Sequence, residues 1–273
     1  MLTELVLPTV IWPLLIMGVA FALGRGSAWM PAVAAFVAGL GAYGWIQGAM
    51  QWPPTAMDGI WLMGLVASVA ALLRPGRAVA LLLLGLPVSV WAVWVFASSL
   101  TPMVWVAQIL ALLVPVGLAW LWLNRADPDD AGSLFWPTAF LIAPAAVLAP
   151  VIGLAGSLKL AELAGALGVV MAVSWLIGFG LPLVSGQRPH RTWRALVPVL
   201  TLPLVWVALV AYHLVEVSPW ALLPAALPWV GSAVLVVARR PDTRWLEPVV
   251  LVAATALPLV FSLWYAWPEQ SLY

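Results

Sequence analysis

The residues of this chain that could do chemistry together lie in one short stretch, AYHLVEV at 211–217. His213 is one of two histidines, and Glu216 follows at a spacing of three, which places both side chains on one face of a continuous helix. A histidine–carboxylate pair can bind a cation, respond to external pH or serve in acid–base catalysis. The competing interpretation, which the sequence favours, is a structural pair at the polar end of a helix leaving a bilayer.

A metal ion held by this pair would need further ligands from other helices, and Asp58 and Glu162 are the candidates. The chain has no cysteine, which excludes thiolate metal sites and disulfides. Neither GxxxxGK[ST] nor GxGxxG occurs, and no nucleophile–base pair stands out. We therefore predict no catalytic residue, no metal site and no cofactor, and we do not expect an enzyme.

The composition is that of a membrane protein. Hydrophobic residues make up 65% of the chain and charged residues only 8%, against about 25% charged in soluble domains. A water-soluble fold cannot bury that much apolar surface, so lipid must be part of the solvent. The net charge of +1 gives no reason to expect a nucleic-acid partner.

Ten apolar runs are long enough to be membrane spans, because a helix of about 20 residues crosses ~30 Å of hydrocarbon. They lie at 5–24, 28–50, 56–73, 78–99, 103–123, 134–156, 162–185, 195–217, 219–238 and 248–267. None alternates polar and apolar residues as barrel strands do. The first run has neither the basic start nor the cleavage site of a signal peptide. The sequence thus predicts an all-α integral membrane protein with about ten transmembrane helices.

Basic residues give the orientation of these helices. All ten arginines fall in odd-numbered loops, and Lys159 alone falls in an even-numbered one. Short loops rich in Arg and Lys mark the cytoplasmic side. We therefore expect both termini outside, Arg-rich loops in the cytoplasm, and a multi-pass protein of a bacterial inner (plasma) membrane.

The loops leave no room for a soluble domain. The longest connection, 124–133, has ten residues, so residues 1–273 are expected to form a single polytopic domain. If ATP drives this protein, a separate energising chain must hydrolyse it. Membrane lipids and partner membrane subunits are the other partners that the sequence allows.

Arginines recur at intervals of roughly fifty residues, which suggests five pseudo-repeated helical hairpins of the kind seen in transporters. The alternative is that an Ala-, Leu-, Val- and Pro-rich chain repeats short motifs by composition alone. Proline inside a helix removes a backbone hydrogen bond and kinks it. The predicted helix hinges are Pro87, Pro144, Pro150, Pro203 and Pro258.

Polar side chains gather towards the predicted outer side, and the central third of every span lacks ionisable residues. A polar vestibule or substrate-binding site there would use His213, Glu216, Asp58, Glu162, Gln47 and Gln108. The function we expect is permease-like, for an apolar or weakly polar substrate, including a lipid-derived one. The alternative is a non-catalytic membrane subunit that anchors or stabilises a larger complex. An intramembrane lipid-modifying enzyme is the weakest of the three hypotheses.

Overall fold

The computed structural model describes residues 6–23, 30–48, 55–60, 62–65, 101, 103, 110, 135–186, 193–231 and 246–267. Its regular elements in these ranges are all helical, which confirms the prediction of an all-α protein. They are η1 (Leu7–Ile11), α2 (Trp12–Leu23), α3 (Met30–Gln47), α7 (Phe135–Ala139), α8 (Ala143–Leu154), α9 (Leu158–Trp175), η4 (Leu176–Gly180), α10 (Leu181–Val184), α11 (Trp193–Leu214), α12 (Pro219–Leu222), η5 (Leu223–Ala226) and α14 (Glu247–Ala266).

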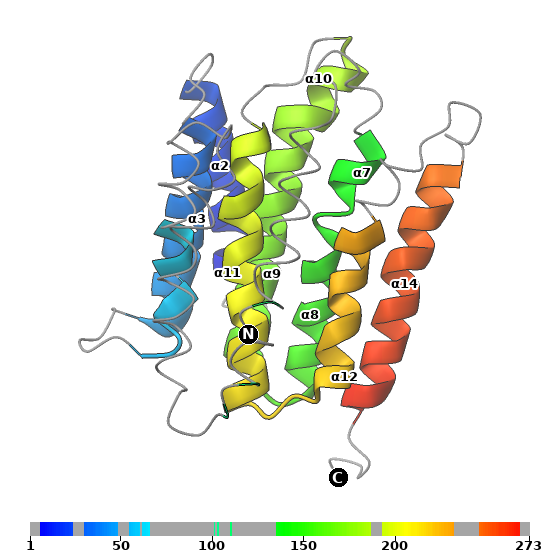
Figure 1. Cartoon of the computed structure of the whole chain (residues 1–273). Coiled ribbons are helices and arrows are strands. Elements are labelled where there is room, and N and C mark those ends of the chain that lie inside the picture. Colours follow the sequence, from blue (N-terminus) through cyan, green and yellow to red (C-terminus); the bar gives the residue numbers. More distant parts are fainter. Residues whose placement is uncertain are drawn as a thin grey trace.

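The long helices run side by side, and α9 runs opposite to its neighbours α8 and α11 (Figure 1). Helix α9 occupies the centre, where it packs against α2, α3, α8 and α11. The C-terminal ends of α3, α8, α11 and α14 lie together at one end of the bundle, at the bottom of Figure 1. Turns that follow α3 and α8 therefore lie at the same end as the turn between α11 and α12. We call this end of the bundle the lower end.

The tightest connection is the turn between α8 and α9. Gly156 has φ +99°, a conformation that favours glycine because it has no Cβ. The amide of Gly156 donates to the carbonyl of Gly153 at 3.1 Å, and that of Ser157 donates to Ile152 at 3.2 Å. These two bonds form a Schellman motif, which ends α8 and allows α9 to reverse direction immediately.

Replacing Gly156 with alanine is expected to lower the free energy of unfolding by about 1 kcal/mol, because a Cβ is disfavoured at positive φ. Gly165→Ala is the matched control, since Gly165 lies inside α9 with no atom near the added methyl group. Alanine is the better helix former, so the control should be neutral or stabilising. Thermal unfolding of both variants in detergent measures the difference; equal melting temperatures would contradict it.

Small residues let α8 and α9 approach closely. A Cβ added to Gly168 would lie 2.8 Å from the Cβ of Ala145, and one added to Gly153 would lie 3.5 Å from that of Ala161. Such glycine and alanine contacts allow helix backbones to pack without large side chains between them. The α8–α9 hairpin is therefore closely packed, and α2, α3, α11 and α14 all contact it.

The predicted spans differ from the observed helices in their boundaries. The run 134–156 is broken at 140–142 between α7 and α8, directly before Pro144 in the first turn of α8. The run 162–185 begins earlier, at Leu158, and passes through the π-helical turn η4 before α10. Chain reversal at Gly156 explains the early start, since α9 begins as soon as the turn is complete.

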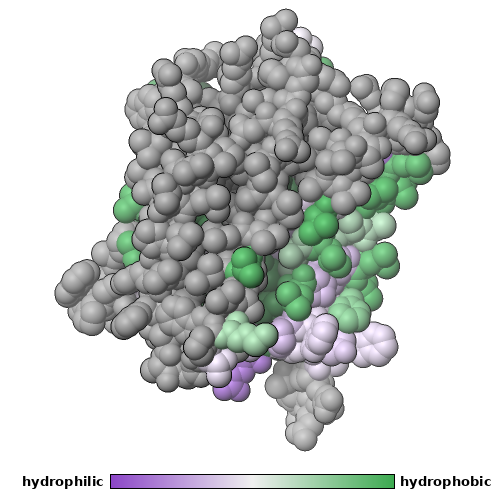
Figure 2. All heavy atoms as spheres, viewed as in Figure 1, coloured by the Kyte–Doolittle hydropathy of each residue, from purple (hydrophilic) through white to green (hydrophobic). Residues whose placement is uncertain are grey.

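Two described helices, Leu158–Gly178 and Glu247–Ala266, are long and apolar enough to cross a membrane, by length and composition. Four shorter apolar helices accompany them: Leu7–Leu23, Val33–Gln47, Ala143–Leu154 and Thr201–Leu214. Little of α14 is buried, and its exposed residues include Val252, Leu257 and Val260. The side of the bundle where α14 lies shows this apolar surface (Figure 2). An apolar exterior of this kind is stable only against lipid or another apolar surface.

Candidate functional site

A buried carboxylate lies at the lower end of the bundle, on the segment that follows α3. Asp58 is only 2% exposed. One of its oxygens accepts a hydrogen bond from the Tyr43 hydroxyl at 2.7 Å. The other accepts from the backbone N–H of Thr55 at 2.6 Å and from its hydroxyl at 2.7 Å. Three donors replace the water that burial removes, so the carboxylate fixes this segment to α3.

The same segment is attached to α11 through Trp206, which is completely buried. The indole N–H of Trp206 donates to the carbonyl of Ala56 at 2.8 Å. A Cβ added to Gly59 would overlap the indole ring of Trp206. Only glycine at position 59 allows the backbone to lie so close to this ring. The 55–60 segment is therefore held between α3 and α11 by two different sets of contacts.

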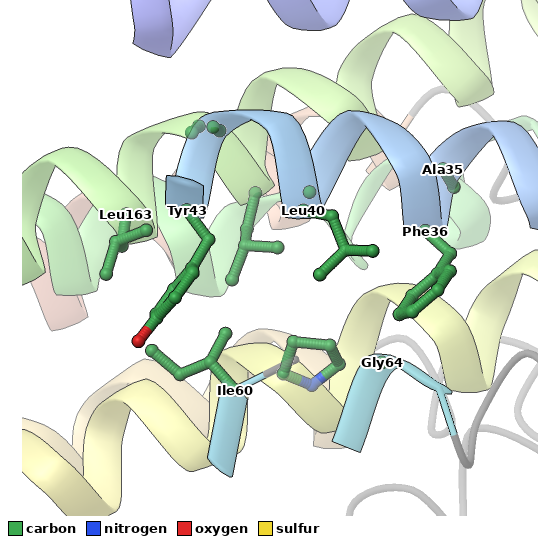
Figure 3. Close-up of a pocket in the computed structure, with 12 residues that line it drawn as sticks. Ala35, Phe36, Leu40, Tyr43, Ile60, Gly64 and Leu163 are labelled. Carbon is green, nitrogen blue, oxygen red and sulfur yellow. The ribbon is translucent and has the colours of Figure 1, made fainter. Parts of the chain in front are cut away.

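An apolar pocket lies directly beside this segment (Figure 3). Its lining comes from α3, α9, α11 and the stretch around residues 60–64; the residues are Ala35, Phe36, Gly39, Leu40, Ala42, Tyr43, Ile60, Gly64, Leu163, Ala166, Leu167 and Pro203. Among the described lining residues, Tyr43 alone carries a polar side-chain group, its hydroxyl. The pocket volume is about 20 Å³. That is room for about one water molecule, so the pocket is closed to anything larger.

The stretch that contains His213 and Glu216 forms a second hollow, an open depression of about 300 Å³ at the corner between α11 and α12. Its lining is Tyr212, His213, Glu216, Val217, Ser218 and Pro219. Helix α11 ends at Leu214, and Glu216 has φ +58°. The two residues are therefore not one turn apart on a continuous helix, as their spacing suggests. They are brought together by the turn instead.

The chain matches no protein family, no curated protein and no solved structure. Its site must therefore be interpreted from its own geometry.

The other predicted vestibule residues separate. Gln47 ends α3 at the lower end, and its amide nitrogen is buried without a hydrogen-bond partner. Glu162 lies on α9, half-buried, and lines neither hollow. Gln108 and Pro87 lie outside the described residues. Within the part of the chain that the structure describes, no group of three or more His, Asp or Glu side chains could hold a metal ion.

The remaining predicted hinges lie in three helices. Pro150 is inside α8 and Pro258 is inside α14. Pro203 is within α11, and of these prolines it is the one that lines the apolar pocket. Proline cannot donate a backbone hydrogen bond, so α11 has a weakened point in the pocket wall.

Sequence reasoning missed the residues that surround Asp58. Thr55 and Asp58 form half of a capping box: the Asp58 carboxylate, three residues after Thr55, accepts from the Thr55 N–H, and the Thr55 hydroxyl donates to the same carboxylate. That pattern was present in the sequence TAMD and marks a helix start. Tyr43 and Trp206 carried no such signal, because they belong to other helices.

Proposed function

We propose that this chain is a multi-pass protein of a bacterial inner membrane, permease-like in architecture. Its substrate would be apolar or weakly polar, including a molecule derived from lipid. Support comes from the antiparallel packing of α9 with α8 and α11 and from an apolar outer surface on α14. With about ten spans predicted from the sequence, the described helices would form part of a larger set.

The observation that carries this proposal is the apolar pocket with the 55–60 segment beside it. Its lining suits an apolar group, and the Tyr43 hydroxyl offers one hydrogen bond to a weakly polar one. Its present volume of about 20 Å³ corresponds to a closed state. Opening would need the 55–60 segment to move from α3 and α11, and Pro203 gives α11 a point at which to bend.

Cysteine labelling tests the orientation, because the chain has no cysteine of its own. Lys159→Cys lies exposed at the lower end, and Ser185→Cys lies exposed after α10 at the opposite end. A membrane-impermeant maleimide added to intact cells should label the first variant and reach the second only after permeabilisation. The unsubstituted protein is the control. Labelling of both from one side, or in the reverse order, would contradict the predicted topology.

Filling the pocket tests its role in transport. Ala166 is buried in the pocket lining, and Ala166→Leu would occupy the space that a substrate needs. The probe is a phosphatidylethanolamine with an NBD group on one acyl chain, in proteoliposomes where dithionite bleaches only the outer leaflet. We expect the flipping rate to fall by about tenfold, equivalent to a barrier higher by roughly 1.4 kcal/mol.

The matched control is Ala22→Leu, the same substitution at an exposed position of α2, which should flip the probe at the unsubstituted rate. Both variants must elute as single species in detergent, since overpacking can unfold a helix bundle. If vesicles with the unsubstituted protein flip the probe no faster than protein-free vesicles, a lipid-derived substrate is contradicted. Equal rates for the two variants would contradict a role for the pocket.

A second function, a non-catalytic membrane subunit, is favoured by the exposed apolar face of α14. A partner chain could cover this face as well as lipid does. Purification from the native membrane distinguishes the two: a stoichiometric partner that is lost on Val252→Ser would support the subunit role, and a protein that purifies alone would oppose it.

A further inference from the structure

An apolar stripe leads away from the corner depression along the next helical stretch. Trp220, Leu223, Leu227 and Val230 are all largely exposed and follow each other at intervals of three or four residues. That spacing places them on one face of a helix. The stripe begins beside Pro219, which lines the depression, so polar hollow and apolar stripe are continuous.

The length of this stripe corresponds to one leaflet of a bilayer. From Trp220 to Val230 the rise is about 15–17 Å, at 1.5 Å per α-helical residue and 2.0 Å per residue of the 3-10 turn η5. Half of a hydrocarbon core of ~30 Å is about 15 Å. An acyl chain that lies along the stripe would therefore place its headgroup at the depression.

The charge of the lower end favours a cation in the depression. Three described carboxylates lie there, those of Asp58, Glu162 and Glu216, against the single ammonium group of Lys159. Asp58 is occupied by Tyr43 and Thr55. Glu216 is exposed at the depression, with its carboxylate free to accept hydrogen bonds from a ligand.

The conformation of Glu216 agrees with a binding role. A residue with a side chain at φ +58° costs about 1–2 kcal/mol relative to an ordinary conformation, and glycine would avoid most of that cost. Ser218 adds a hydroxyl acceptor to the same hollow, and the aromatic ring of Tyr212 forms part of its wall. Together these groups offer acceptors and a ring face to an ammonium group.

We propose that the corner between α11 and α12 binds a phospholipid whose headgroup ends in a primary ammonium. Glu216 accepts hydrogen bonds from the ammonium, and the stripe from Trp220 to Val230 holds an acyl chain. This proposal rests on the membrane location proposed above and does not depend on transport.

Native mass spectrometry of the full chain in detergent tests this site with three lipids that share dioleoyl chains. These are phosphatidylethanolamine, phosphatidylcholine and phosphatidylglycerol. We expect phosphatidylethanolamine to bind most tightly, because its ammonium has N–H donors that choline lacks. Glu216→Gln should reduce the preference for phosphatidylethanolamine over phosphatidylglycerol by about fivefold, as expected for loss of one exposed ion pair.

Three further variants separate an effect on binding from an effect on folding. Glu216→Gly removes the carboxylate while relieving the positive φ, so it should lose the same preference without loss of stability. Glu162→Gln removes a carboxylate at the same end but outside the depression, so it should reduce the preference far less than Glu216→Gln does. Leu227→Ser should weaken all three lipids equally, because it shortens the apolar stripe.

The proposal is overturned if the three lipids bind equally or if Glu216→Gln leaves the preference for phosphatidylethanolamine over phosphatidylglycerol unchanged. Free ethanolamine should compete only at much higher concentration; competition at lipid-like concentrations would overturn the contribution of the stripe. If the unsubstituted protein flips no NBD-lipid but binds phosphatidylethanolamine selectively, the permease function is rejected and the lipid site is kept. If the unsubstituted protein flips NBD-lipid but binds the three lipids equally, the lipid site is rejected and the permease function is kept.

Discussion

Asp58→Ala is expected to lower the free energy of unfolding by about 3 kcal/mol, among the largest effects for a polar residue of this chain. The substitution removes an acceptor of three hydrogen bonds and leaves the Tyr43 hydroxyl and the Thr55 N–H without their partner. Hydrogen bonds to a charged group contribute about 1.5–3 kcal/mol each, and the losses are not additive.

Two companion variants separate the contributions to this effect. Tyr43→Phe removes one hydrogen bond and keeps the ring that lines the pocket, so about 1.5 kcal/mol should be lost. Glu162→Ala removes a half-buried carboxylate with none of these bonds, and a change within about 0.5 kcal/mol is expected. Thermal unfolding in detergent ranks the three; an Asp58→Ala protein as stable as Glu162→Ala would contradict the buried network.

The helical class of this fold follows from composition and run length. Backbone N–H and C=O groups in lipid must bond to each other, and long apolar stretches that do not alternate polar and apolar residues can achieve this as helices. Helix boundaries were less predictable. Gly156 and Pro144 mark the two limits of α8, yet glycine and proline occur throughout the sequence, and many of the described ones, such as Gly165 and Pro258, lie inside helices.

The site was predictable only in part, for a physical reason. The sequence identified Asp58 as a polar residue near the outer end of its run, but grouped it with His213 and Glu216 as a vestibule. Its actual partners are Tyr43 and Thr55. Contacts between helices depend on rotation and depth, which apolar runs of nearly uniform composition do not encode. The His213–Glu216 spacing was misleading because α11 ends between the two residues.

Two interactions fix the 55–60 segment, and they differ in kind. The Asp58 network is polar and joins the segment to α3, whereas the Trp206 contact is mostly steric and joins it to α11. A permease that opens beside this segment would need to break both. Substitutions at Asp58 and Trp206 should therefore also change the flipping rate. The change should be larger for the contact that is more fully broken in the transition state of opening.

Gly59→Val is expected to destabilise the protein by about 3 kcal/mol, the upper range for overpacking, because its side chain would overlap the buried ring of Trp206. Gly18→Val is the matched control, since a Cβ at position 18 meets no atom within 4 Å. β-Branching in a helix should leave that control within about 1 kcal/mol of the original protein.

Combining Gly59→Val with Trp206→Ala tests whether the two residues act on each other. Trp206→Ala alone should cost about 3–5 kcal/mol, because it opens a cavity and leaves the Ala56 carbonyl without its donor. In the double variant the valine enters that cavity, so the total loss should be smaller than the sum of the single losses by about 1–2 kcal/mol. Unfolding of all four proteins under one condition completes the cycle. Strict additivity would show that the 55–60 segment does not pack on Trp206.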